Sequence, residues 1–173
     1  MRRILDFFSF VLLGVLLLAT GMALFGPAQL PPKVPTHLDP LGQPDAWTTR
    51  SSLEILPTIA VIVYLLLTVV AAYSSLAKHA AQSEPESGPS LEPLILKLIV
   101  SIKAELMGIF TCIQLSSLHA FRHPDDPSSM WGAAMWVLLA SVFATVAWYL
   151  TAMIRMERSQ AEVTSSAEQP EAR

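Results

Sequence analysis

The sequence predicts an all-α membrane protein with four transmembrane helices and a Pro-rich extracytoplasmic loop between the first two. Composition is the first reason: 53% of the 173 residues are hydrophobic and only 14% are charged, whereas a soluble domain usually has about 25% charged residues. Distribution is the second. The charges collect at the ends and connections, and the apolar runs between them match the roughly 20 residues that a helix needs to cross a bilayer.

The first predicted span is 4–25. Arg2 and Arg3 precede it, as basic residues precede a signal peptide, but the apolar run of about twenty residues is longer than the usual signal-peptide core. We therefore predict a retained helix. The second span is 55–75, with Pro57 near its start, where a missing N–H does little harm.

The last predicted span, 131–154, carries no charge. Trp131 and Trp136 lie near one of its ends, and Trp148 and Tyr149 lie toward the other. Tryptophan and tyrosine are enriched at the two membrane–water interfaces. The spacing of these four rings is therefore typical of a helix that crosses the whole bilayer.

The third predicted span, 104–121, is less apolar, because it contains Glu105, Gln114 and His119. We expect Glu105 to be solvated near the cytoplasmic boundary, and Gln114 to make hydrogen bonds between helices. Before this span lies 91–103, where leucine and isoleucine recur at every fourth position. This segment is either an amphipathic helix at the interface or the first part of one long tilted helix.

Basic residues predict the orientation. With the N-terminus inside, eight of the eleven lysines and arginines fall on the cytoplasmic side, as the positive-inside rule requires. Both termini are then cytoplasmic. The predicted units are a two-helix membrane unit at 1–75 carrying the loop 26–52, a flexible linker at 76–93, a second two-helix unit at 94–154, and a disordered tail at 155–173.

The loop after the first span is unusually stiff, because five of the thirteen prolines lie within 30–50. Pro31, Pro32 and Pro35 predict an extended polyproline-like strut over 30–36. The run Asp39-Pro40-Leu41-Gly42 has the preferences of a type I turn, so the chain should reverse just after His37. The return would bring His37, Asp39 and Asp45 into one small region.

The loop resembles the signature of the family called domain of unknown function 1648, L-P-x-x-[IV]-P-x-H-[FW]-[ND]-x-x-G-x-[PV]-D followed by a basic residue. The matching positions are Leu30, Pro31, Val34, Pro35, His37, Asp39, Gly42, Pro44, Asp45 and, more loosely, Arg50. Leu38 departs from the pattern, which has an aromatic residue there. The resemblance implies a helical protein of the bacterial inner membrane. The same domain occurs in SdpI-type membrane proteins, so the resemblance also implies immunity to a secreted toxin or signalling through a repressor sequestered at the membrane.

The candidate binding residues are those of the loop: Pro31, Pro35, His37, Asp39, Gly42, Pro44, Asp45 and Arg50. A divalent-metal site at His37, Asp45, His119 and His123 is a second interpretation, because imidazole and carboxylate groups suit zinc or manganese. Its alternative is that these side chains hold the loop in shape by hydrogen bonds.

Enzymatic motifs are missing from the sequence: there is no Ser–His–Asp order, His-Glu-x-x-His pair or phosphate-binding loop. We therefore predict a non-enzymatic protein without a cofactor. Its expected partners are the lipid bilayer and either a peptide toxin or a cytoplasmic regulator. The net charge of −3 predicts no nucleic-acid binding, and the oligomeric state is left open. The alternative function is a small membrane component of a transport complex.

Overall fold

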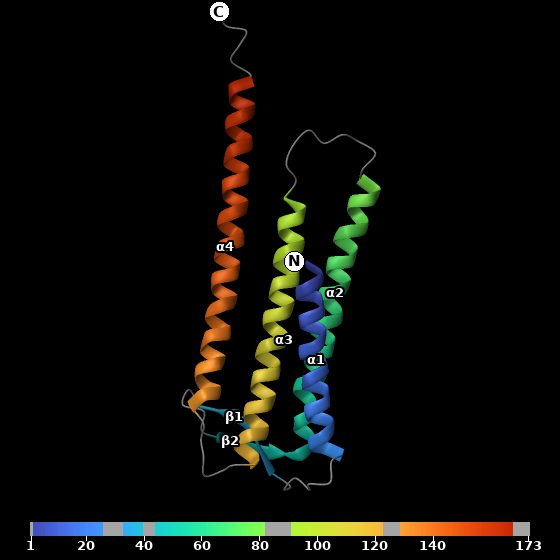
Figure 1. Ribbon diagram of the computed structural model, residues 1–173, viewed down its shortest axis with the longest axis vertical. Coiled ribbons are helices and arrows are strands. Elements are labelled where there is room, and N and C mark those ends of the chain that lie inside the picture. The colour runs from blue at the N-terminus through green and yellow to red at the C-terminus, as the bar shows by residue number, and fades with distance from the viewer. Residues whose placement is uncertain (1, 26–32, 40–43, 82–90, 123–128, 168–173) are drawn as a thin grey trace, which may run out of the picture.

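The computed structural model describes residues 2–25, 33–39, 44–81, 91–122 and 129–167. Its four helices are α1 (Arg2–Phe25), α2 (Ile55–Ala81), α3 (Glu92–Arg122) and α4 (Ser129–Ala167). Two strands, β1 (Lys33–Leu38) and β2 (Pro44–Thr49), and the 3-10 helix η1 (Arg50–Glu54) lie between α1 and α2. The helices run alternately up and down. The hairpin lies at one end of the bundle, and the start of α1 and the end of α4 lie toward the other (Figure 1).

Three segments are long and apolar enough to cross a membrane: Arg2–Phe25, Ser52–Ser74 and Gly132–Glu162. The prediction of a helical membrane protein is thus confirmed for these three. Helix α3 is not among them, because lysine, glutamate, glutamine and histidine interrupt its apolar residues. The fold also contains one element type that the sequence did not predict, the two-stranded antiparallel hairpin.

Helix α3 is the centre of the bundle. It packs against α1, α2 and α4, whereas α4 makes its main helix contacts with α3 alone. Two apolar clusters lie along α3. One joins Leu13, Leu16, Ala60 and Met107. The other lies nearer the hairpin and joins Ala23, Leu24, Leu53 and Leu118. The helix whose apolar residues are most interrupted at membrane length is therefore the one that packs against all three others.

Segment 91–103 belongs to α3, which answers the question that the sequence left open. The helix begins at Glu92 with Pro93 in its first turn, where proline is well tolerated. The carbonyl of Leu91 accepts hydrogen bonds from the amides of Leu94 at 3.0 Å and Ile95 at 3.1 Å. From there no proline interrupts the chain before Arg122, so a single long helix forms.

Helices also replace part of the predicted disorder. Helix α4 continues to Ala167, through most of the tail predicted at 155–173. The tail's first half is rich in Arg, Met, Glu, Gln and Ala, which are strong helix formers, and no proline occurs before Pro170. Similarly, α2 runs to Ala81, into the predicted linker 76–93. The rest of that linker, 82–90, and the end of the tail, 168–173, lie outside the described residues.

Candidate functional site

The predicted loop is a β-hairpin. Strands β1 and β2 pair antiparallel, with Lys33 opposite Thr49 and His37 opposite Ala46. The expected reversal after His37 is therefore present, although three of the four residues of the type I turn predicted at 39–42 lie outside the described residues. The polyproline-like strut is wrong for the part from Lys33 onward. A polyproline helix has no backbone partner, and here β2 supplies one.

The strand pairing of this hairpin is irregular next to a proline. The register shifts between Pro35 and His37, so that Thr36 has no Cα partner, and it shifts again between His37 and Leu38. Proline cannot donate a ladder hydrogen bond, and bulges are where strands accommodate it. A bulge bends and twists a strand. The extended conformation that the prolines predicted is therefore present from Lys33 onward, as a paired strand and not as an unpaired strut.

The candidate residues are distributed as follows. Pro31, Gly42 and His123 lie outside the described residues. The backbone places Pro35 and His37 on β1, Pro44 and Asp45 on β2, and Arg50 at the start of η1. Asp39 follows β1 directly and is half-buried, whereas Asp45 is exposed. His119 lies near the end of α3. Within the part of the chain that the structure describes, no group of three or more His, Cys, Asp or Glu residues is placed to hold a metal ion.

The hairpin is tied to the bundle at its exit. Strand β1 contacts α3, and the side chain of Leu53 in η1 is buried in the apolar cluster with Leu118. Gln114 is 2% exposed and reaches two elements. Its Nε2 donates to Thr20 Oγ1 of α1 at 3.0 Å and, at 3.5 Å, to the Leu53 carbonyl. The interhelical role predicted for Gln114 is confirmed, and the same side chain links α3 to the base of the hairpin.

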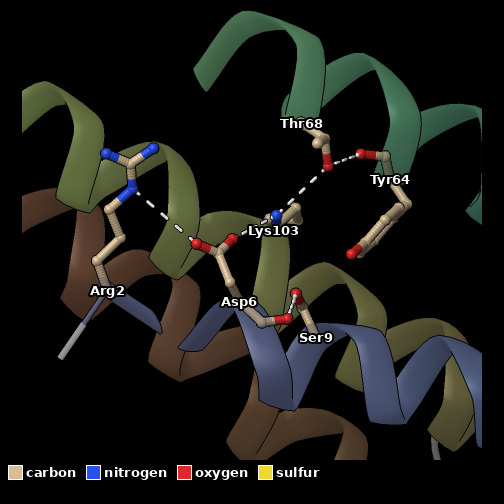
Figure 2. A network of polar contacts seen from close by, with 6 residues as sticks. All are labelled: Arg2, Asp6, Ser9, Tyr64, Thr68 and Lys103. Atoms are coloured by element: carbon tan, nitrogen blue, oxygen red, sulfur yellow. Dashed lines mark hydrogen bonds and ion pairs between the residues drawn. The ribbon is translucent and has the colours of Figure 1, made fainter. Parts of the chain in front are cut away.

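A buried ion pair lies toward the other end of α3 and was not predicted. Lys103 Nζ lies 2.6 Å from Asp6 Oδ1 of α1, and the Lys103 side chain is only 3% exposed. Figure 2 shows Lys103 between α1 and α2, with its ammonium directed at the Asp6 carboxylate. An unpaired ammonium at this depth would be costly, so the pair fixes the position of α1 against α3.

Helix α2 completes the surroundings of Lys103. The ammonium lies 4.9 Å from the centre of the Tyr64 ring, within the range of a cation–π contact. Nζ also donates to Thr68 Oγ1 at 3.4 Å, and this hydroxyl donates to the Tyr64 carbonyl at 2.7 Å (Figure 2). One lysine therefore joins three helices. The second oxygen of the Asp6 carboxylate, Oδ2, lies 4.0 Å from Arg2 Nε, and both of these side chains are partly exposed.

Glu105 faces the fourth helix. Thr145 Oγ1 of α4 donates to Glu105 Oε1 at 2.6 Å. The other oxygen, Oε2, is buried and has no hydrogen-bond partner among the described residues. The prediction of a solvated glutamate is therefore wrong, because α4 covers this side of α3. Lys103 and Glu105 are two residues apart, so they project to different sides of the helix and contact different neighbours.

Sequence reasoning missed the Asp6–Lys103 pair because it treated each span separately. A signal was available: Asp6 is the only charge within the first span after its arginines, and Lys103 is an opposite charge at the start of the predicted third span. Charged residues inside membrane segments usually pair with one another. Comparing the charges of different spans at similar depth would have proposed this contact.

Comparison with known proteins adds no relative. No protein-family model matches the chain, and no curated protein or solved structure is significantly similar to it. The resemblance of the hairpin to the domain of unknown function 1648 therefore stays a prediction from the motif residues.

Proposed function

We propose that this chain is a non-enzymatic, four-span protein of the bacterial inner membrane that acts in toxin immunity or membrane signalling, with its hairpin as the recognition element. The observation that carries the proposal is the hairpin itself. It is a paired, bulged structure seated on α3 at one end of a bundle whose other helices suit a membrane. The resemblance of its sequence to SdpI-type proteins supplies the biological role.

Helix α3 is proposed as the fourth span because of its neighbours. Its charged and amide groups are directed at protein partners: Lys103 at Asp6, Glu105 at Thr145, and Gln114 at Thr20. Polar groups at membrane depth are tolerated where they face the bundle interior and are paired. With four spans, both termini lie on one side and the hairpin lies on the other.

Cysteine labelling tests this orientation. In a Cys112→Ala background, Ala46→Cys on the hairpin should react with a membrane-impermeant maleimide in intact spheroplasts. Ser159→Cys on α4 should react only after lysis, because the basic residues of this region favour the cytoplasmic side. Both original side chains are exposed, so access in each case depends on the side of the membrane. Labelling of Ser159→Cys in intact spheroplasts would contradict the proposed orientation.

The hairpin offers a compact surface for a peptide. Lys33, Asp45 and Trp47 are exposed on it, and Trp47 is 53% exposed. An exposed tryptophan flanked by charged side chains is typical of an anchor residue at a binding surface. A peptide that meets the outer face of the membrane would reach this surface before it reaches the helices.

Survival of cells challenged with secreted antimicrobial peptides tests the role. Cells with the wild-type protein should survive better than cells without it, and Trp47→Ala combined with Asp45→Asn should abolish this protection. Loss of an aromatic anchor costs about 2 kcal/mol or more, roughly 30-fold in affinity. Ala46→Ser, on the same strand, is the matched control and should keep full protection. The amount of each variant in the membrane must be equal. Equal survival with and without the wild-type protein would rule out immunity.

The alternative is a small component of a transport complex. It is favoured by α4, which makes its main helix contacts with α3 alone and has most of its surface uncovered. Stable copurification of the wild-type protein with an ATPase, unaffected by the hairpin variants, would support this alternative over immunity.

A further inference from the structure

Helix α4 carries a groove near the end that the proposed orientation places at the cytoplasm. The lining residues follow one stripe of the helix: Ala144, Ala147, Trp148, Thr151, Ala152 and Arg155. Its volume is about 300 Å³, at the lower end of the range for small-ligand sites. Four of the six have short side chains, and the two large ones, Trp148 and Arg155, lie two turns apart along the same stripe.

The groove is separate from the packing face of α4. That face meets α3 through Thr145, which donates to Glu105, and includes the buried ring of Tyr149. Trp148, next to Tyr149 in the sequence, is 73% exposed. The last part of α4 also extends past the ends of α2 and α3 (Figure 1). In a membrane, the groove would therefore open toward lipid.

Helix geometry sets the depth of the groove. Arg155 lies 23 residues after Gly132, where the apolar segment of α4 begins. At 1.5 Å per residue this distance is about 34 Å, slightly more than the roughly 30 Å of a hydrocarbon core. The guanidinium of Arg155 would thus reach the headgroups, and Trp148 would lie about 10 Å deeper, beside the upper part of the acyl chains.

We propose that this groove binds one anionic phospholipid of the cytoplasmic leaflet. The phosphate pairs with Arg155, and an acyl chain lies along Ala144, Ala147 and Thr151. A guanidinium fork matches phosphate oxygens, and basic sites beside membrane helices on the cytoplasmic side recognise anionic headgroups. This inference rests on the orientation in the proposed function, because Arg155 must face the cytoplasmic leaflet.

The neighbouring charges agree with an anionic ligand. Arg158, one turn beyond Arg155, is exposed and adds positive charge at headgroup level. Glu157 is exposed too, but two residues along a helix place it on the opposite side from Arg155. The charges next to Arg155 at this end of the groove are therefore positive and attract an anionic headgroup. An apolar groove without Arg155 would accept neutral and anionic lipids equally.

Native mass spectrometry of the purified full chain tests the site. With phosphatidylglycerol and phosphatidylcholine added in equal amounts, the wild-type protein should retain phosphatidylglycerol preferentially. Arg155→Gln should lower this preference about fivefold, the effect of one basic contact near the membrane surface. Arg3→Gln, at an exposed position on α1, removes a basic residue away from the groove and should change the preference less than twofold.

A second pair of variants tests the groove without changing charge. Ala147→Leu fills the groove at an exposed position and should lower retention of both lipids, whereas Ala140→Leu, exposed on the same helix outside the groove, should not. Equal retention of the two lipids by the wild-type protein, or equal effects of Arg155→Gln and Arg3→Gln, would overturn the proposal. A shift from dimer to monomer in Ala147→Leu with unchanged lipid retention would instead assign the groove to a second copy. None of these readouts involves a peptide, so they stand apart from the survival test.

Discussion

Replacing Asp6 with leucine is expected to lower the free energy of unfolding by about 3 kcal/mol, the cost of breaking a buried ion pair from one side. The variant leaves the Lys103 ammonium, with a side chain only 3% exposed, without its carboxylate at 2.6 Å. The remaining neighbours, the Thr68 hydroxyl and the Tyr64 ring, carry no charge that could replace it. Unfolding in mixed micelles, followed by helical circular dichroism, measures the change.

Removing the lysine of the ion pair should lower the free energy of unfolding by less than removing the aspartate. Lys103→Met leaves the Asp6 carboxylate, but that side chain is 38% exposed and Arg2 lies 4.0 Å away. Water and Arg2 can therefore stabilise it, and we expect a loss of about 1 kcal/mol. The asymmetry is the informative result, because an exposed ion pair would give two small and equal effects.

The variant with both substitutions completes a double-mutant cycle. Asp6→Leu with Lys103→Met removes both charges and should lie within about 1 kcal/mol of the wild type, because an apolar pair often replaces a buried ion pair at little cost. Arg2→Gln is the control for surface electrostatics and should change the stability by less than about 0.5 kcal/mol. Additive losses in the double variant would show that Lys103 and Asp6 act independently, and would contradict the pairing.

The extent of the helices could be predicted only in part from the sequence. The apolar runs located α1, α2 and α4 because an apolar segment of sufficient length has few alternatives to a membrane helix. The residues at which these helices end were harder to predict from the sequence. Ser159 and the residues after it are polar enough to suggest disorder, yet a helix that has already nucleated extends cheaply through good helix formers, one hydrogen bond per residue.

The hairpin shows a different limit. The sequence correctly predicted an extended segment that reverses after His37, but prolines alone do not reveal whether an extended segment pairs with another strand. Pairing depends on the return segment, where Trp47 and the two threonines that follow it favour strands. Similarly, nothing within segment 91–103 shows that Asp6 lies opposite Lys103.

Replacing Met107 with alanine is the second large effect that we expect. Met107 is fully buried and packs with Leu13, Leu16 and Ala60, so its side chain contacts α1 and α2 from α3. Truncating a buried methionine leaves a cavity and typically costs about 2–5 kcal/mol. In a membrane, where packing rather than water exclusion drives helix association, we expect about 2–3 kcal/mol. The same unfolding assay measures it.

Two methionine variants control for this result. Met107→Leu keeps most of the volume and should cost less than about 1.5 kcal/mol. Met130→Ala truncates a side chain that is 67% exposed at the start of α4, and should change the stability by less than about 0.5 kcal/mol. Equal losses in Met107→Ala and Met130→Ala would contradict the central position of α3.

The size of the Met107 effect decides what holds the three helices together. Met107 lies one turn from Lys103 on one side and one turn from Thr111 on the other. The Thr111 hydroxyl shares its proton between the Met107 carbonyl at 2.7 Å and the Leu12 carbonyl of α1 at 3.1 Å. Interhelical hydrogen bonds of this kind are worth about 1 kcal/mol in membranes. If Met107→Ala lowers the free energy of unfolding by about 3 kcal/mol, the apolar cluster around Met107 contributes more to the association of α1, α2 and α3 than one such hydrogen bond. The polar contacts of Lys103 and Thr111 would then mainly fix the register of these helices.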